Sequence, residues 1–284
     1  MSIMQEISQQ DFYGERPLFN HHHVTLKNST IHEGESALKE CSDIVAQDCT
    51  FIGRYPFWHN TNTKILNCHL TVDCRAPLWY DRNIVMQGCR SEAPKMLREV
   101  DNVKLIDCDF PDAQELLWKC RNVEVHNTRI GKADYIFFNS DNLQIDGLTL
   151  QGKYSFQYCH NIHIKNSVLN TKDAFWESAD ILIEDSQVLG EYLAWHSTNL
   201  TLVHCHIAGT QPLCYAHNLK LIDCTFDADA DLAFEYSSVQ ATIQSPVTSV
   251  KNPLTGFIKA KSFGEIILDE NQKEPHDCKI ELLD

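Results

Sequence analysis

The chain has 284 residues, in which 39 Asp and Glu outnumber 24 Lys and Arg, so its formal net charge is −15. A 43 % share of apolar residues is enough for a sizeable core and excludes a disordered chain, and the absence of any run of about 18 apolar residues excludes a transmembrane helix. The acidic balance disfavours nucleic acid and anionic membranes as partners.

The N-terminal segment and the cysteines indicate the cellular compartment in which we expect the protein. Residues 1–19 lack the basic and apolar regions of a signal peptide, and the twelve cysteines include no C-x-x-C pair. Free thiols in such number are typical of a reducing compartment, so we expect a cytoplasmic protein. The missing C-x-x-C spacing disfavours zinc ribbons and iron–sulfur clusters, and we expect no metal and no cofactor.

A repeat of 19–21 residues begins after the first twenty residues. Each copy reads Asn, apolar, x, apolar, x, Asp/Asn/Gly, small, x, apolar. The small position is filled in turn by Ser29, Cys49, Cys68, Cys89, Cys108, Thr128, Leu148, Ser167, Ser186, Cys205 and Cys224. Such regularity predicts one solenoid domain over 1–284, with an N-terminal cap (1–20), about 11 coils (21–237) and C-terminal coils or a cap (238–284).

The first half of each copy alternates with period two and predicts a strand. The Asp/Asn/Gly position suits a left-handed residue that turns the chain, and the small position suits a buried stack of small side chains. The leading Asn can pass amide hydrogen bonds from coil to coil, as ladders do in stacked strands. It recurs at Asn62, Asn83, Asn102, Asn122, Asn142, Asn161, Asn199 and Asn218.

The second half of each copy is short, aromatic and in places proline-containing, which disfavours a helix. A leucine-rich repeat has a similar period, but it requires a Leu where this chain places residues such as Cys41, Asn60 and Asp81. A single-stranded parallel β-helix of three sheets fits the pattern better. The fold class expected is therefore all-β.

All five Trp share one repeat position: Trp58, Trp79, Trp118, Trp176 and Trp195. The preceding column is apolar and predicts core, so strand alternation directs the Trp column outward. Lys39, Arg98 and Glu235 also occupy that column, which favours an outer face. Two interpretations remain open: an end segment covers the Trp row, or a ligand does.

The coils around the later Trp combine aromatic, acidic and basic residues, an inventory that suits a carbohydrate. We expect an oligo- or polysaccharide to contact Arg75, Trp79, Tyr80, Lys153, Tyr154, Tyr158, Lys172, Trp176, Tyr192, Trp195 and Tyr215. In this hypothesis Lys153 and Lys172 hold an anionic group, while Trp176 and Trp195 stack on sugar rings.

If the protein is an enzyme of lyase or glycosidase type, Asp173 and Glu177 are the candidates for acid and for nucleophile or base, and His196 would orient or shuttle the proton. The alternative is a solvated charged face on a non-catalytic scaffold that uses the same side for a protein contact or a homo-oligomer. The histidine clusters 21–23 and 204–206 and the acidic segment 227–231 lack the pattern of a known metal site.

Ten short motifs spread over residues 3–270 together resemble the bacterial DUF3737 family. Among them are F-Y-G-E-R (12–16), R-A-P-L-W-Y (75–80), T-K-D-A-F-W (171–176), G-E-Y-L-A-W (190–195) and D-L-A-F-E-Y-S (231–237). The resemblance implies a right-handed, pectin-lyase-like β-helix but no activity, because the family is uncharacterised. The polygalacturonase motifs N-T-D, D-D, G-H-G and R-I-K are missing, which disfavours classical pectin hydrolysis.

Overall fold

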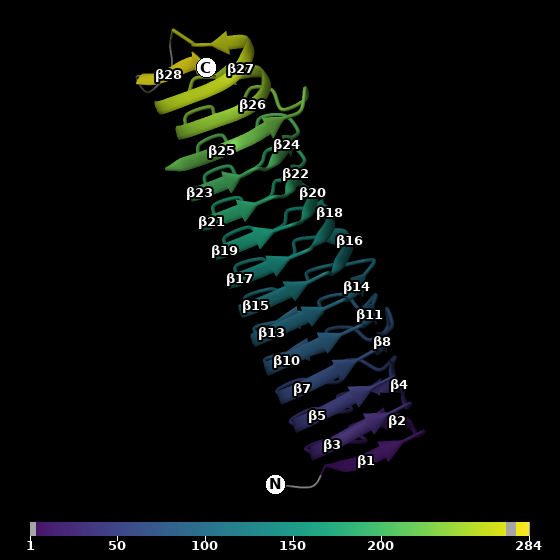
Figure 1. Ribbon diagram of the computed structural model, residues 1–284. Coiled ribbons are helices and arrows are strands. Elements are labelled where there is room, and N and C mark those ends of the chain that lie inside the picture. The colour runs from purple at the N-terminus through teal and green to yellow at the C-terminus, as the bar shows by residue number, and fades with distance from the viewer. Residues whose placement is uncertain (1–3, 271–276, 284) are drawn as a thin grey trace. The chain divides into compact units, whose positions relative to one another are not determined.

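The computed structural model describes residues 4–270 and 277–283, and the chain divides into two compact units, Met1–Gln144 and Ile145–Asp284. Each unit is a parallel β-solenoid, with about 14 turns in all. Within the described ranges the chain forms strands and turns but no helix. No helix long and apolar enough to cross a membrane is therefore found there. Figure 1 shows the strands of successive coils side by side in chain order within each unit.

Unit 1 carries two parallel ladders of strands. The first sheet consists of β1 (Gln5–Ser8), β3 (His22–Lys27), β5 (Ser42–Gln47), β7 (Thr61–Leu66), β10 (Arg82–Gln87), β13 (Asp101–Ile106) and β15 (Arg121–His126). The second consists of β2 (Asp11–Glu15), β4 (Thr30–Glu35), β6 (Thr50–Phe51), β8 (His69–Leu70), β11 (Arg90–Ser91), β14 (Asp109–Phe110) and β16 (Arg129–Asp134). β17 (Asp141–Asp146) runs across the division between the units.

Unit 2 repeats this arrangement. Its first sheet contains β19 (His160–Lys165), β21 (Ala179–Glu184), β23 (Thr198–Val203), β25 (Leu219–Phe226), β26 (Ser238–Lys251), β27 (Thr255–Ile267) and β28 (Asp277–Leu282). Its second contains β18 (Thr149–Lys153), β20 (Val168–Lys172), β22 (Gln187–Leu189) and β24 (His206–Ala208).

The third side of each coil is mostly turn, although three sheets were expected. Only β9 (Leu78–Trp79) and β12 (Leu97–Arg98) pair as strands there in the described part of the chain. Left-handed residues such as Tyr55 (φ 57°) and His59 (φ 59°) break the pleat of each coil. Neighbouring coils are still joined, since Phe57 N–H donates to Pro77 O at 3.0 Å and His59 N–H donates to Trp79 O at 3.1 Å.

The predicted columns are found where the repeat placed them. The column before the Trp is core, because Leu38, Phe57, Leu78, Leu97 and Leu117 are each 0 % exposed. The small column is buried as well, and its thiols donate to main-chain carbonyls: Cys108 Sγ lies 3.3 Å from Ile106 O and 3.5 Å from Met86 O. The Asp/Asn/Gly position is left-handed, with φ of 53° at Asp48 and 52° at Asp107.

The coils start earlier than residue 21, which raises their number above the 11 expected. β1 pairs in parallel with β3, and β2 pairs with β4, so residues 5–15 already form a coil. Gln10 stands in the small position of this coil, which hides the repeat in the sequence. The strand ladder also continues through β26 and β27 to β28.

Candidate functional site

The third side of unit 2 holds the residues for which catalysis was predicted. Lys172 ends β20 and Asp173 and Glu177 follow it, while Tyr192 and His196 follow β22 one coil later. Asp173 (φ 52°), Glu177 (φ 50°) and His196 (φ 58°) are all left-handed corner residues. This side therefore places carboxylates, an imidazole and phenols in adjacent coils, as the repeat predicts.

The charged groups on this side pair with one another across coils. Lys172 Nζ lies 3.1 Å from Glu191 Oε2 and 5.0 Å from the centre of the Tyr192 ring. The hydrogen bond that Lys172 donates to Glu191 raises the pKa of Lys172. Burial raises the pKa of Asp173, with Lys172 acting in the opposite direction and Glu191 in the same one.

His196 is held by aromatic rings rather than by a carboxylate. Its ring stacks on Tyr215 at 4.9 Å and lies 5.4 Å from the Trp176 ring. Within residues 4–270 and 277–283, no hydrogen bond or ion pair joins the side chains of Asp173, Glu177 and His196. The structure therefore brings the predicted catalytic residues to one side without linking them into a contact network.

The predicted binding residues fall in both units. Lys153, Tyr154 and Tyr158 lie in unit 2, with Lys153 Nζ 5.2 Å from the centre of the Tyr154 ring. Tyr158 is 39 % exposed. Arg75, Trp79 and Tyr80 lie in unit 1, where Tyr80 is 40 % exposed and Trp79 is half-buried.

Four of the five indole N–H groups on the third side tie their coil to the next coil, a role that the sequence did not reveal. Trp58 Nε1 donates to Ala76 O at 2.7 Å, Trp79 Nε1 to Lys95 O at 2.7 Å, and Trp195 Nε1 to Gln211 O at 2.8 Å. Trp118 Nε1 donates in the same way to Tyr135 O. All four acceptors belong to residues with positive φ, between 49° and 58°. The Trp column thus satisfies carbonyls of the left-handed turns.

The faces of these rings also cover each other. Trp58 and Trp79 stack at 5.1 Å with planes 6° apart, and the Arg98 guanidinium lies 4.5 Å from the centre of Trp79 and 4.6 Å from that of Trp118. Both faces of Trp79 are therefore occupied within unit 1. Within unit 1 the rings of Trp58, Trp79 and Trp118 thus contact a ring or a cation of a neighbouring coil, an arrangement that neither interpretation of the sequence included.

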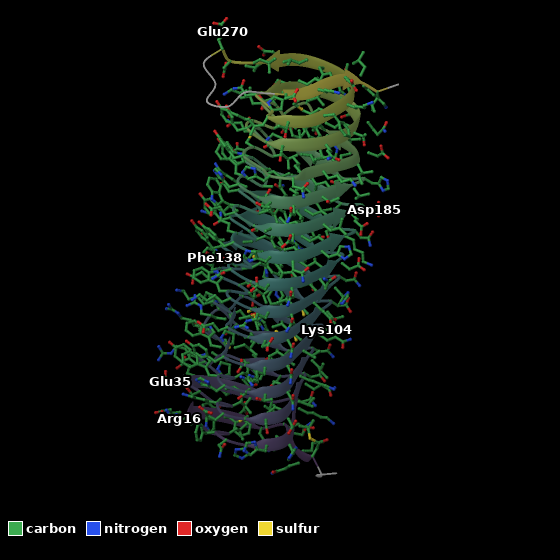
Figure 2. The ribbon with its side chains drawn as sticks, turned by 90° about the vertical axis from the view of Figure 1, so that its left-hand side faces the viewer. Arg16, Glu35, Lys104, Phe138, Asp185 and Glu270 are labelled. Carbon is green, nitrogen blue, oxygen red and sulfur yellow. The ribbon has the colours of Figure 1, made fainter. Side chains whose placement is uncertain are left out.

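A groove lies over the first sheet of unit 1, on a different side from the Trp column. In Figure 2, Phe138 of the Trp column and Lys104 of β13 project from opposite edges of unit 1. The groove has a volume of about 710 Å³. Side chains from successive strands line it: Asp43, Asn62, Lys64, Asn83, Val85, Asn102, Lys104, Asn122, Glu124, Asn142 and Gln144.

The floor of the groove is the predicted Asn ladder. Asn62 Nδ2 donates to Asp43 Oδ1 at 2.9 Å, Asn83 Nδ2 to Asn62 Oδ1 at 2.8 Å, and Asn102 Nδ2 to Asn83 Oδ1 at 2.8 Å. These Asn are exposed and left-handed, with φ of 57–62°. The ladder is therefore an outer feature, and a short amide that tolerates positive φ suits it.

Sequence reasoning identified the Asn ladder but assigned no site to it. The walls of the groove, Lys64, Val85 and Lys104, occupy one register position in β7, β10 and β13. In the sequence they look like the outward residues of any exposed strand. The signal that marks them is their place two residues after each ladder Asn.

The histidine clusters and the cysteines do not form a metal site in the part of the chain that the structure describes. His23 Nδ1 lies 3.2 Å from Asp43 Oδ2, and His22 Nδ1 lies 2.8 Å from Ser42 Oγ. His206 Nδ1 lies 2.9 Å from Thr225 Oγ1. These imidazoles are engaged by neighbouring coils.

Solved structures similar to this chain share little of its sequence. One is a pentapeptide repeat protein involved in heterocyst differentiation regulation from the cyanobacterium Nostoc sp. (12 % identity, 78 % of this chain and 92 % of that chain, TM-score 0.37). Another is a surface adhesin of Streptococcus pneumoniae (10 %, 93 % and 74 %, TM-score 0.42). A third is the A-module of a mannuronan C-5 epimerase from Azotobacter vinelandii (8 %, 96 % and 86 %, TM-score 0.30).

At 8–12 % identity and TM-scores of 0.30–0.42, these likenesses carry no argument about activity. No curated protein matches the chain. The motifs spread along the coils do agree with a family: the family model described as "Protein of unknown function (DUF3737)" matches residues 5–281, and the chain belongs to the DUF3737 family.

Proposed function

We propose that the protein binds an extended carbohydrate chain, and that the groove over the first sheet of unit 1 is the binding site. The observation that carries the proposal is the amide floor of this groove. Asn62, Asn83 and Asn102 each use one N–H and one oxygen lone pair along the ladder. A carboxamide has two N–H donors and two lone pairs, so each keeps one donor and one acceptor for a ligand.

Sugar hydroxyls match this pattern because each of them both donates and accepts. The ladder offers such a pair once per strand, at a spacing of about 4.8 Å, close to the length of one sugar unit. Val85 supplies an apolar strip between Lys64 and Lys104, and Lys104 pairs with Glu124 at 2.8 Å. Concave sites that bind small polar ligands combine such apolar walls with a few fixed polar groups.

The proposal moves the predicted carbohydrate site away from the Trp column. Binding by stacking on Trp79 would require a ring face, and both of its faces are covered by Trp58 and Arg98. Tyr80 is 40 % exposed, so the third side stays a second candidate contact surface rather than the main one.

The rest of the fold expectation belongs to the proposal as well. We propose a right-handed, three-sheet, pectin-lyase-like β-helix that forms one domain. The repeat length of 19–21 residues and the β9–β12 pair support the three-sheet form. The cytoplasmic location stays a prediction from the cysteine content.

Calorimetric titration with neutral and uronic tetrasaccharides tests the binding, while Trp emission reports its location. Binding heat without a change of Trp emission is expected, since the indoles lie on the third side. Val85→Trp should fill the groove and abolish binding. Thr201→Trp, at the corresponding outward position of β23 in unit 2, is the matched control and should bind normally. Binding that survives Val85→Trp, or no binding by any sugar, would refute the proposal.

Catalysis on the third side of unit 2 is a second candidate function. It is favoured by the raised pKa of Asp173, since a carboxylic acid that stays protonated to a higher pH is a better general acid. If Asp173 and Glu177 act together, the amide variants Asp173→Asn and Glu177→Gln should each abolish turnover of a bound oligosaccharide and spare its binding. Full turnover by the double variant would exclude these roles.

A further inference from the structure

A second, more polar hollow of about 450 Å³ lies in unit 1, where the strands of the first sheet begin. It is formed at the corner between the third side and β10, β13 and β15. The residues that line it are Tyr80, Asp81, Arg82, Glu99, Val100, Asp101, Lys119 and Arg121.

Three cations of this hollow lack the carboxylate partners that Arg98 and Lys104 have in the same unit. Arg98 and Lys104 each lie within 3 Å of a carboxylate oxygen. No carboxylate oxygen of the described chain lies within 4.0 Å of the charged nitrogens of Arg82, Lys119 or Arg121. In a chain with net charge −15, three unpaired cations around one hollow are unexpected.

Carboxylates share the lining without neutralising it. Glu99 is exposed, and Asp101 accepts a hydrogen bond from Asn122 Nδ2 at 2.9 Å. Beside the three cations, the lining holds Glu99 and Asp101 and a third carboxyl, Asp81, that is buried. An anionic group placed between the guanidinium groups could make charge-assisted, bidentate hydrogen bonds.

Asp81 is the independent observation that points to a ligand. Its side chain is 1 % exposed; Oδ1 accepts a hydrogen bond from Asn60 N–H at 2.6 Å, and Oδ2 has no partner in the described chain. Burial raises the pKa of Asp81 well above its usual range. Its Oδ2 is therefore a buried carboxyl oxygen in the lining of the hollow for which the described chain supplies no hydrogen-bond partner.

The hollow continues the groove along the same strands. Arg82 precedes Asn83 in β10, Asp101 precedes Asn102 in β13, and Arg121 precedes Asn122 in β15. The register pairs Arg82 with Asp101 and Asp101 with Arg121, so the two guanidinium groups start from the strands on either side of β13. A ligand that lies on the Asn ladder therefore passes the mouth of the hollow.

We propose that this hollow binds an acidic substituent, so that the carbohydrate held by the groove is an acidic saccharide whose carboxylate or phosphate contacts Arg82, Lys119 and Arg121. This inference rests on the proposed function. It assigns a new anion-binding site and narrows the ligand from sugars in general to sugars that carry one negative charge or more.

Calorimetry with matched tetrasaccharides, one neutral and one uronic, tests the inference with the full chain. The uronic form should bind about tenfold more tightly, the value of one charge-assisted hydrogen bond. The double variant Arg82→Gln/Arg121→Gln should lose that advantage and retain the affinity for the neutral form. Arg129→Gln removes the same charge from an exposed, unpaired site outside the hollow and is the matched control.

Monomeric glucuronate and inorganic phosphate distinguish the sources of the anion and separate the two proposals. Tighter binding of one of them, lost in the double variant and kept in Arg129→Gln, supports the site and identifies its preferred anion. Equal affinity for neutral and uronic tetrasaccharides overturns the inference and leaves the groove intact. Binding of the monomeric anions without binding of any tetrasaccharide supports the anion site and overturns the proposed function. No binding of any probe overturns both.

Discussion

Replacing Trp79 decides whether the Trp column is structural. Trp79→Phe keeps a ring between Trp58 and Arg98 but removes the N–H that donates to Lys95 O at 2.7 Å. The loss of this hydrogen bond, which leaves a turn carbonyl without its donor, should cost about 1–2 kcal/mol of unfolding free energy. Trp79→Ala also removes a stacked pair and a cation–π contact, and its total cost should be about 3 kcal/mol.

The assay is urea denaturation followed by far-ultraviolet circular dichroism, since Trp emission changes with the substitution itself. Tyr80→Phe is the matched control, because it changes the neighbouring exposed side chain and should cost less than about 0.5 kcal/mol. Equal midpoints for Trp79→Phe and Tyr80→Phe would refute the structural role of the indole N–H. Trp79→Phe should bind sugars as the wild type does, and a folded Trp79→Phe protein that fails to bind would indicate that the binding site lies on the third side.

Three further predictions follow from burial. Burial raises the pKa of Asp81 in the folded state, so the contribution of its proton to stability is complete below a pH of about 4 and is lost as the pH rises through that raised pKa. The difference in melting temperature between Asp81→Asn and the wild type should therefore grow in favour of Asp81→Asn from pH 4 to pH 8. A difference that stays constant over this range would contradict the reasoning. Cys278 is the least buried of the twelve cysteines, so a thiol reagent should label one thiol quickly in the native protein, and Cys278→Ser should remove that fast phase; several fast thiols would contradict the buried column. Phe57→Ala opens a cavity at a ring that is 0 % exposed and packs 4.8 Å from Phe51, and should cost about 3–5 kcal/mol in urea denaturation; a cost below about 1 kcal/mol would mean that the core collapses around it.

The strands and corners were predictable because their residues carry strong local preferences. A corner that turns through a left-handed residue favours Asp, Asn or Gly, and the following buried position admits only a small side chain, so Asp107 and Cys108 mark their corner in the sequence. Repetition every 19–21 residues then multiplies a weak signal into a clear one. The first coil was not predicted because its residue at the small position, Gln10, is exposed, so its side chain does not have to be small.

The third side was not predictable in the same detail. Its left-handed residues include Tyr55, Lys95 and Glu115, which have no local preference for positive φ and adopt it because neighbouring coils impose the conformation. The acceptors of the indole N–H groups lie 16–18 residues further along the chain, at positions that only the stacking of coils determines. Composition suggested a ligand for the Trp row, whereas the geometry gives the indole N–H of Trp58, Trp79, Trp118 and Trp195 an acceptor within the chain.

The groove and the ladder follow from a single chemical asymmetry. Each ladder amide donates toward the preceding coil and accepts from the following one, so the first member of a ladder needs only to accept. A carboxylate can only accept, and Asp43 accepts from Asn62 in unit 1, as Asp180 accepts from Asn199 in unit 2. His23 beside Asp43 supplies the remaining partner of that carboxylate. The ladder is thus polarised along the chain, and Asn62, Asn83 and Asn102 each keep one N–H donor and one lone pair for a ligand in the groove.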